Sequence, residues 1–492
     1  MRRRVLIAVL LLLAVVVGTR LAFLARDFDT IATAAAFEAT HGNRTELRAF
    51  LRRMPKGGDL HTHLAGAVYA ERFIAWAAEQ KLCADLAHTL LSKPQCDAPG
   101  DVPVADALHD QNLYDRLVNA FSTRAFVPTV AVPSDHDKFF AAFGKFGAVT
   151  GTNFADMTID QLKEYDGENV QYVEFMTSFY CPDHRDRFIT AMAEQKDDAG
   201  RLAALRANGL DSCVAAKRSE LAAAIGKIGN SLGCDAQRTQ PGCRVTFRYI
   251  AQIPRNSSLD EVFLQTAIAA ALIRAESQVV ALNLVQSEDN LVARRDYTRQ
   301  MQIIAFLASD VPVALHAGEL WLGDVPPPDL TFHIRQAVEI GHARRIGHGV
   351  DLAFEHDMEG LLAEMRARPV VVEINLSSND IILGVRGKDH PLPTYLAAGV
   401  PVVLSTDDAG VSRINLTNEY LRAARDYGLS YRKLKTIARN ALLYSFLDER
   451  QKRDELERFD RSYAEFERSV AHGRPLVQNV VTLLTAAVSP PP

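Results

Sequence analysis

The sequence has no excess of basic residues and no repeated or low-complexity segment. Its 492 residues include 55 Lys and Arg against 60 Asp and Glu, so the formal charge is -5. Because nucleic-acid binding depends on basic side chains that neutralise phosphates, this balance argues against a nucleic-acid partner. Glycine (28) and proline (21) are close to their average shares, which excludes collagen-like and low-complexity chains. The 48% of hydrophobic residues indicates a globular body of two or three average domains, or one large barrel with insertions.

The chain also lacks a GxGxxG motif after any early strand, and it lacks a CxxC pair. The first absence argues against an open, doubly wound dinucleotide-binding sheet, and the second weakens a structural zinc site. Six cysteines are present, an even number that fits disulfides in an oxidising compartment. Sequence proximity favours Cys83–Cys96 and Cys234–Cys243, which leaves Cys181–Cys213. The sequence does not fix this connectivity, and buried free thiols remain the alternative.

One long apolar run is present, and it stands at the N-terminus. Three arginines at positions 2–4 precede apolar residues 5–18, the pattern of a secretory signal. Arg20 interrupts the run and the small-x-small cleavage site is poor, so an uncleaved anchor over residues 5–25 is an equal alternative. No second run of this length follows. We therefore expect an exported protein, periplasmic or extracellular, either released or held at the membrane by this segment.

Short β-branched segments alternate with amphipathic stretches through the rest of the chain. Eight strands are expected, in GGDLHTHL, VQYVEFMTS, VTFRYIAQI, QVVALNLV, VPVALHAG, RRIGHGV, VVVEINLS and PVVLSTDD. Strands that alternate with helices indicate a parallel sheet, and eight of them indicate a closed barrel. The sequence thus predicts an α/β fold, a (β/α)8 barrel of the TIM type.

We divide the chain into four parts. Residues 1–25 are the signal peptide or anchor, and 26–55 are an N-terminal helical segment, read as one helix from Phe28 to Met54. Residues 56–475 are the barrel, and 476–492 are a C-terminal tail. Insertions near 83–110 and 183–243 are polar, turn-rich and cysteine-bearing, and the stretch from Ser430 to Arg468 is expected to be helical.

Metal-binding side chains stand at the ends of several expected strands. His61 and His63 are two residues apart on a strand, so both side chains face the same side. His316 ends VPVALHAGE, and Asp407 ends PVVLSTDD. An HxH pair alone is more often structural. Because barrel enzymes build their sites at the carboxyl ends of strands, the combined set favours zinc with one position open for water.

His348 stands in RIGHG at another strand end and is a further candidate ligand, and two carboxylates beside these residues are candidates for acid–base work or substrate binding. Glu319 follows His316 by three residues. A helix-start carboxylate is the alternative for Glu319. Asp408 adjoins Asp407, and two such carboxylates repel each other unless one binds a cation and the other binds substrate. The remaining histidines are interpreted as surface residues, among them His88, His109, His333, His342, His356 and His472.

The motifs MPKGGDLHTHLAGA, HAGE, RIGHG, SSN and LSTDD occur in this order between Met54 and Phe446. In this combination the chain resembles the adenosine deaminases of the metal-dependent amidohydrolase superfamily, and MPKGG and LVQSED resemble their secreted, growth-factor-type branch. The resemblance implies a zinc-dependent hydrolase that converts adenosine to inosine and ammonia, and deoxyadenosine to the corresponding deoxy product. HDKFFAAFGKF resembles the aromatic helix that lines the family's pocket, and IARNALLYSFL resembles its last barrel helix.

The resemblance also implies a role for each candidate residue. It assigns one zinc ion per chain to His61, His63, His316 and Asp407. Glu319 would donate a proton to the purine N1, and His348 would orient or deprotonate the water on the zinc. Asp408 would hydrogen-bond the purine N7.

Two positions depart from the family's pattern. The family has an acidic residue just after the second histidine, where it contacts the ribose 5′-hydroxyl, but the residues that follow His63 are Leu64 and Ala65. Glu174 or an insertion residue would have to make this contact instead. Gln286 stands where the family has a glycine whose backbone amide meets the purine; the amide is retained, but the pocket wall becomes larger. The chemistry is therefore better supported than the identity of the substrate.

Three hypotheses follow. The first is an exported zinc deaminase acting on adenosine, and the second keeps the chemistry but moves it to another 6-aminopurine nucleoside, base or nucleotide. The third is a non-catalytic surface nucleoside binder, which the complete ligand set disfavours. The expected partner is a small purine nucleoside and no nucleic acid, while membrane anchoring through residues 5–25 and a homodimer are left open.

Overall fold

The computed structural model describes residues 27–85, 87–91 and 96–473. The expected signal or anchor segment and the expected tail at 476–492 lie outside the described residues. Within the described ranges, no helix combines the length and the apolar character needed to cross a bilayer.

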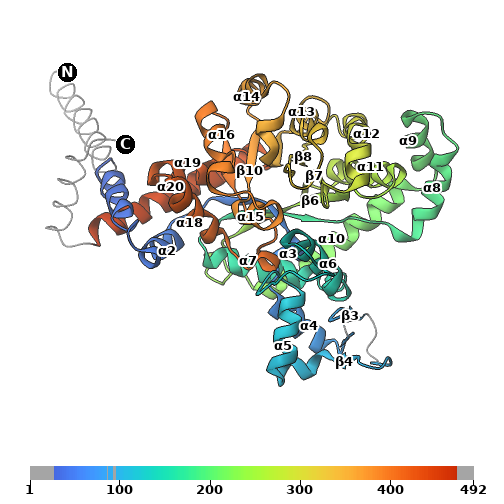
Figure 1. Cartoon of the computed structure of the whole chain (residues 1–492), viewed down its shortest axis with the longest axis horizontal. Helices are drawn as coiled ribbons and strands as arrows, with labels where there is room; N and C mark the ends of the chain where they lie inside the picture. Colours follow the sequence, from blue (N-terminus) through green and yellow to red (C-terminus); the bar gives the residue numbers. More distant parts are fainter. Residues whose placement is uncertain (1–26, 86, 92–95, 474–492) are drawn as a thin grey trace, which may run out of the picture.

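Eight parallel strands form the centre of the molecule, at the positions expected from the sequence (Figure 1). The first sheet has the order β1-β5-β6-β7 and the second has the order β11-β10-β9-β8. Their bounds are β1 Gly58–His63, β5 Tyr172–Thr177, β6 Thr246–Pro254, β7 Val279–Val285, β8 Ala314–Ala317, β9 Arg345–His348, β10 Val371–Ile374 and β11 Val402–Leu404. The α/β class and the parallel pairing are confirmed.

The two sheets meet at two seams. The expected closed barrel is wrong, because the strands do not pair continuously at these seams. Each seam has a single isolated parallel bridge, Thr62 with Asp407 and Leu282 with Val313. Asp407 has left the strand conformation at φ +58°, and β11 has only three residues, so the ladder cannot continue along β1. At the other seam only the carbonyl of Pro312 accepts a backbone hydrogen bond, from Leu282. The strands therefore form two adjoining sheets and not one continuous hydrogen-bonded ring.

Helices connect successive strands and cover the sheets, as a parallel arrangement requires. After β1 come α3 Leu64–Ala67, α4 Ala70–Glu79, α5 Gln111–Ala120, α6 Asp135–Thr150 and α7 Phe154–Gly167. Between β6 and β8 lie α11 Leu259–Ala275 and α12 Leu291–Leu307. The second sheet carries α13 His333–Glu339, α14 Met358–Ala367, α15 Leu376–Leu383, α16 Leu392–Ala398, α17 Ala409–Ser412 and α18 Leu416–Tyr427.

The two ends of the described chain are helical. The single helix expected over residues 28–54 is wrong: residues 27–38 form one helix, and α2 Arg44–Arg53 forms a second. Asn43 separates them because its side chain caps the first turn of α2 and is bound to Thr45 and Glu46 N–H groups. The helical C-terminal stretch is confirmed as α19 Tyr431–Leu443 and α20 Glu449–His472.

The insertion near 83–110 is a small antiparallel sheet beside the barrel (Figure 1). It consists of β2 Cys83–Ala84, β3 Leu90–Leu91 and β4 Val102–Pro103, followed by a short 3-10 helix, η1 Val104–Leu108. The disulfide Cys83–Cys96 ties it together.

The insertion near 183–243 is helical, so its description as turn-rich is wrong. It contains α8 Arg185–Ala193, α9 Asp198–Ala207 and α10 Leu210–Leu232. Disulfides Cys181–Cys213 and Cys234–Cys243 lie at its two ends, and all three expected pairs are present. The insertion boundaries and the division into domains remain predictions.

Candidate active site

The candidate residues come together at the carboxyl ends of the strands. His61 and His63 lie on β1, His316 lies on β8, and His348 is the last residue of β9. Asp407 follows β11 and is joined to β1 by two backbone hydrogen bonds, one to the carbonyl of His61 and one from the N–H of His63. The β1–β11 seam thus brings two segments far apart in the sequence into one site.

Four side chains offer ligand atoms that all lie within 4.8 Å of one another: His61, His63, His316 and Asp407. The Nε2 atoms of His63 and His316 are 3.3 Å apart, and Oδ1 of Asp407 is 3.4 Å from His61 Nε2 and 3.3 Å from His63 Nε2. Ligand atoms about 2.0–2.1 Å from a tetrahedral zinc ion are about 3.3–3.4 Å apart. Moreover, the polar contact of the buried His61 Nε2 is with another member of this set, Asp407. The donor set and its spacing fit a zinc-sized cation.

Each ligand also has a polar partner on its other side. These contacts fix ring and carboxylate orientation, a recurrent feature of protein metal sites. The pairs are His61 Nδ1–Glu373 Oε2 at 2.7 Å, His63 Nδ1–Gln252 Oε1 at 3.2 Å, His316 Nδ1–Asn283 Oδ1 at 3.0 Å and Asp407 Oδ2–Ser378 Oγ at 2.6 Å. None of these four partners was singled out from the sequence.

Electrostatics differs sharply among the ligands. Burial alone would lower the pKa of His61, but its hydrogen bonds to Asp407 and Glu373 outweigh burial and raise the pKa to about 10. Burial lowers the pKa of His316 well below its ordinary value, and the neighbouring histidines act in the same direction. Burial would raise the pKa of Asp407, yet hydrogen bonds from His61 and His63 bring it well below the usual range. The pocket therefore holds an ionised carboxylate among imidazoles, which suits cation binding.

Glu319 lies in the loop after β8 and is 6% exposed. Glu288 holds this loop, because its carboxylate accepts hydrogen bonds from the backbone N–H groups of Gly318 (3.3 Å) and Glu319 (2.8 Å). Burial raises the pKa of Glu319 well above its ordinary value, and the charges of Asp407 and Glu288 add to this effect. A carboxyl group that retains its proton near neutral pH can act as a general acid.

His348 completes the acid–base group. Its Nδ1 lies 3.4 Å from Glu319 Oε1 and 2.9 Å from the amide nitrogen of Asn379. Burial lowers the pKa of His348 to about 3, so the ring is neutral. Because an amide nitrogen only donates, the contact with Asn379 places the remaining ring proton on Nε2.

Asp408 faces the cavity from the segment after β11, and its Oδ1 is buried without a hydrogen-bond partner. The space for it exists because residue 66 is glycine: a Cβ at Gly66 would stand 1.5 Å from Asp408 Oδ1. Burial raises the pKa of Asp408 well above its usual range, and the adjacent Asp407 adds to the increase. The orphaned oxygen is thus available for a polar group of a ligand.

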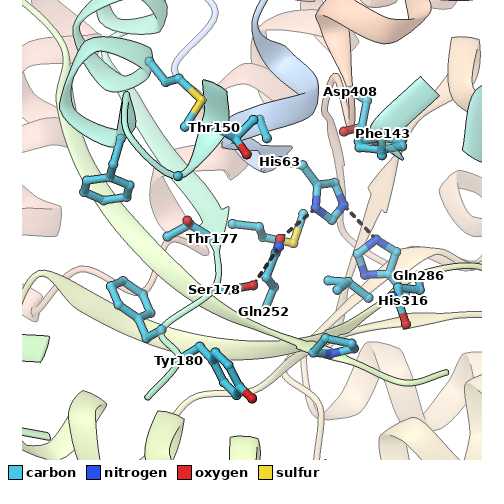
Figure 2. A pocket seen from close by; sticks show the side chains of 18 of the residues that line it. His63, Phe143, Thr150, Thr177, Ser178, Tyr180, Gln252, Gln286, His316 and Asp408 are labelled. Atoms are coloured by element: carbon cyan, nitrogen blue, oxygen red, sulfur yellow. Dashed lines mark hydrogen bonds between the residues drawn. The ribbon is translucent and has the colours of Figure 1, made fainter. Parts of the chain in front are cut away.

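Five of these side chains line one cavity of about 1120 Å³: His63, His316, Glu319, Asp407 and Asp408. Figure 2 shows His63 and His316 side by side, with Gln252 and Ser178 on one side and Asp408 near Phe143 on the other. The aromatic helix expected from the resemblance is confirmed as part of the wall, since α6 contributes Phe139, Phe140 and Phe143. The cavity thus has a polar, metal-binding end and aromatic walls.

Comparison with known proteins identifies the group to which this site belongs. The adenosine deaminase family matches residues 224–462. The chain is 31% identical over 169 residues to an adenosine deaminase of Clostridium acetobutylicum, an alignment covering 34% of this chain and 47% of the relative. The matched part of the chain, residues 224–462, belongs to the adenosine deaminase family. The chain spans about half the length of the curated relatives that it matches at 31% identity.

Two other family comparisons cover more of the chain. An adenine deaminase of Rhizobium rhizogenes is 26% identical over 358 residues, which is 72% of this chain and 94% of the relative. The fold is also similar to the N6-methyl-AMP deaminase of Arabidopsis thaliana, with a TM-score of 0.55, 19% identity and coverage of 85% of this chain and 99% of that chain.

The departures from the family's pattern have structural counterparts. Ala65 lines the cavity, so no carboxylate stands at that point of the wall. Glu174 does not replace it, because this residue is fully buried and bound to Tyr172, Arg345 and the Phe446 N–H, and it is not among the lining residues. Gln286 adopts φ +80°, the left-handed region natural to the family's glycine, and its side-chain oxygen accepts the Asn256 N–H.

Two histidines that the sequence places at the surface, His333 and His390, are buried. His333 is fully buried, with Nδ1 2.6 Å from Glu288 Oε1. Arg255, also fully buried, lies 3.4 Å from the same oxygen and donates to the carbonyl of His316. This network connects both ends of the segment 316–319 to the buried charges of Glu288 and Arg255. No local pattern in the sequence indicates the network.

Proposed function

We propose that the protein is a metal-dependent hydrolase that replaces the 6-amino group of adenosine with oxygen and releases ammonia. One observation carries the proposal: a single cavity is lined by the buried acid Glu319, the orphaned Asp408 and three members of the four-ligand set, with the fourth, His61, buried beside them. The family match supports the same enzyme class, a hydrolase acting on the C–N bond of a cyclic amidine.

The metal that we propose is zinc, one ion per chain, held by His61, His63, His316 and Asp407. Three imidazoles with one carboxylate are a ligand set that zinc prefers. A zinc ion bound there would supply a water activated for attack near neutral pH.

Each acid–base residue then has a defined task. Glu319 holds a proton for the purine N1, because attack at C6 otherwise places negative charge on the ring. His348 is neutral with its proton on Nε2, which favours orienting the attacking water over removing its proton. Burial raises the pKa of Asp408, and the protonated carboxyl donates a hydrogen bond to N7, so that a purine bound between Asp408 and Glu319 presents C6 to the ligand cluster.

The alternative is the same chemistry on another 6-aminopurine. Relatives named adenine deaminase and N6-methyl-AMP deaminase support this alternative, and Ala65 removes the carboxylate expected to hold the ribose 5′-hydroxyl. A non-catalytic nucleoside binder is a weaker candidate, because the ligand set and the acid are both intact.

We also propose that the enzyme acts outside the cytoplasm, in agreement with its resemblance to the secreted branch of the family. Three disulfides support an oxidising compartment. The signal or anchor function of residues 1–25, membrane attachment and a homodimer remain predictions.

The experiment that tests the function combines metal analysis with adenosine turnover. Glu319→Gln retains shape but removes the transferable proton, so turnover should fall by roughly 10²–10⁴-fold, the usual scale of general acid–base catalysis. Metal content should not change. Glu339→Gln, on an exposed Arg335 ion pair, is the control and should behave as wild type. A Glu319→Gln variant within about threefold of wild type, far below that scale, contradicts the assignment.

A further inference from the structure

The helix α10 of the second insertion forms part of the cavity wall. Lys217, Glu220, Leu221 and Ala224 line the same space as the ligand cluster. Lys217 and Leu221 follow Cys213 at intervals of four residues, so these three side chains share one helix face. Because Cys213 is bonded to Cys181 in the segment after β5, the disulfide holds this face against the cavity.

The part of the wall formed by α10 carries one positive and one negative charge. Lys217 Nζ lies 2.7 Å from Glu220 Oε2, and the Lys217 side chain is only 16% exposed. Apart from Tyr180, the other ionisable lining residues belong to the candidate metal site and its neighbours: His63, His316, Glu319, Asp407 and Asp408. The cavity also has apolar lining residues, among them Phe154, Met157, Leu221 and Ala224.

The cavity is larger than a nucleoside requires. Its volume of about 1120 Å³ exceeds the range of roughly 300–1,000 Å³ typical of sites for drug-sized ligands, which are themselves larger than adenosine. In a purine, N9 lies across the bicycle from C6. When C6 faces the ligand cluster, the ribose therefore points away from it, toward the rest of the cavity. Because Ala65 lines the cavity, no carboxylate at this point of the wall selects for a hydroxyl group on the 5′ carbon of the ribose.

We propose that the substrate is an adenine nucleoside whose 5′ carbon bears an apolar chain ending in a zwitterionic amino acid group, recognised by Lys217 and Glu220. The apolar chain matches the apolar lining residues of the cavity, and the carboxylate and ammonium match the adjacent charges on α10. A 5′-phosphate is a poorer match, because a dianion close to Lys217 also faces Glu220. The proposal rests on the proposed deaminase function.

Four probes separate the features of such a substrate. They are adenosine, 5′-deoxy-5′-methylthioadenosine, which has only an apolar 5′ group, S-adenosylhomocysteine, which has the zwitterion, and AMP, which has the dianion. We expect S-adenosylhomocysteine to have the highest kcat/KM and AMP the lowest. A preference for adenosine or AMP over S-adenosylhomocysteine overturns the proposal while leaving the deaminase function intact. Failure to deaminate any of the four overturns the deaminase function itself.

A variant on α10 tests the recognition directly. Lys217→Met should lower kcat/KM for S-adenosylhomocysteine by about tenfold or more, the scale of a hydrogen bond to a charged group, and leave that for methylthioadenosine unchanged. Lys227→Met is the matched control, since Lys227 lies on the same helix but pairs with Asp156 and does not line the cavity. Calorimetric binding of S-adenosylhomocysteine to chelator-treated protein should show the same loss without turnover. Equal losses for both probes, or none, contradict the proposal.

Discussion

Glu288 is the residue whose change tests the buried network most directly. Its carboxylate is fully buried and contacts the backbone N–H groups of Gly318 and Glu319, His333 and Arg255. Burial would raise the pKa of Glu288, but Arg255 and His333 outweigh burial and keep the pKa below its ordinary value. The group is therefore ionised at neutral pH. Glu288→Gln retains the shape but removes the charge, which leaves the buried Arg255 uncompensated.

The size of the effect follows from this pairing. Breaking a buried ion pair by removing one partner costs about 3–5 kcal/mol of unfolding free energy. An unfolding entropy of about 2 cal/mol/K per residue amounts to about 1 kcal/mol/K for 492 residues. The melting temperature should therefore fall by about 3–5 °C.

Thermal unfolding of chelator-treated protein measures this shift without a contribution from bound metal. Glu339→Gln serves again as the control, because its pair with Arg335 is exposed and such pairs contribute about 0–1 kcal/mol. Adding Arg255→Met to Glu288→Gln should recover part of the loss, since the second change removes the unpaired charge. A Glu288→Gln melting temperature equal to that of Glu339→Gln would refute the reasoning.

Two further predictions concern the metal and the cysteines. His61→Ala should lose both bound metal and turnover, because it removes a ligand that lies within 3.4 Å of Asp407. His109→Ala, on an exposed loop, is the control and should retain both. Elemental analysis of the purified variants measures the bound metal, and full metal occupancy in His61→Ala contradicts the ligand set. Protein from its native envelope, denatured without reductant, should show no reactive thiols because all six cysteines are paired; six labelled thiols in mass spectrometry would overturn the pairing.

The sequence by itself determined the strands and the residues at their ends. Alternation of β-branched segments with helical ones is a local property, so all eight strands were found at their observed positions. Because side chains alternate along a strand, His61 and His63 were expected on one side of β1. Because barrel enzymes build their sites at the carboxyl ends of the strands, His316, His348 and Asp407 were expected at the same edge. The cysteine pairs nearest in sequence also formed as expected.

Only the tertiary structure decided what surrounds these residues. Glu373, Gln252 and Asn283 support the ligands from strands that are distant in sequence, and no local pattern distinguishes a buried partner from an ordinary polar residue. Arg255 and Glu288 could not be recognised either, because a buried ion pair depends on the packing of separate segments.

The wall formed by α10 was likewise decided in three dimensions. The sequence of α10 indicates a polar insertion. Lys217 becomes a cavity residue only because the Cys181–Cys213 disulfide and the packing of the helix place it there. The two seams were also decided by the tertiary structure. The register and length of both paired strands determine where the hydrogen-bonded ladder between them ends, and the sequence of one strand alone does not specify these properties.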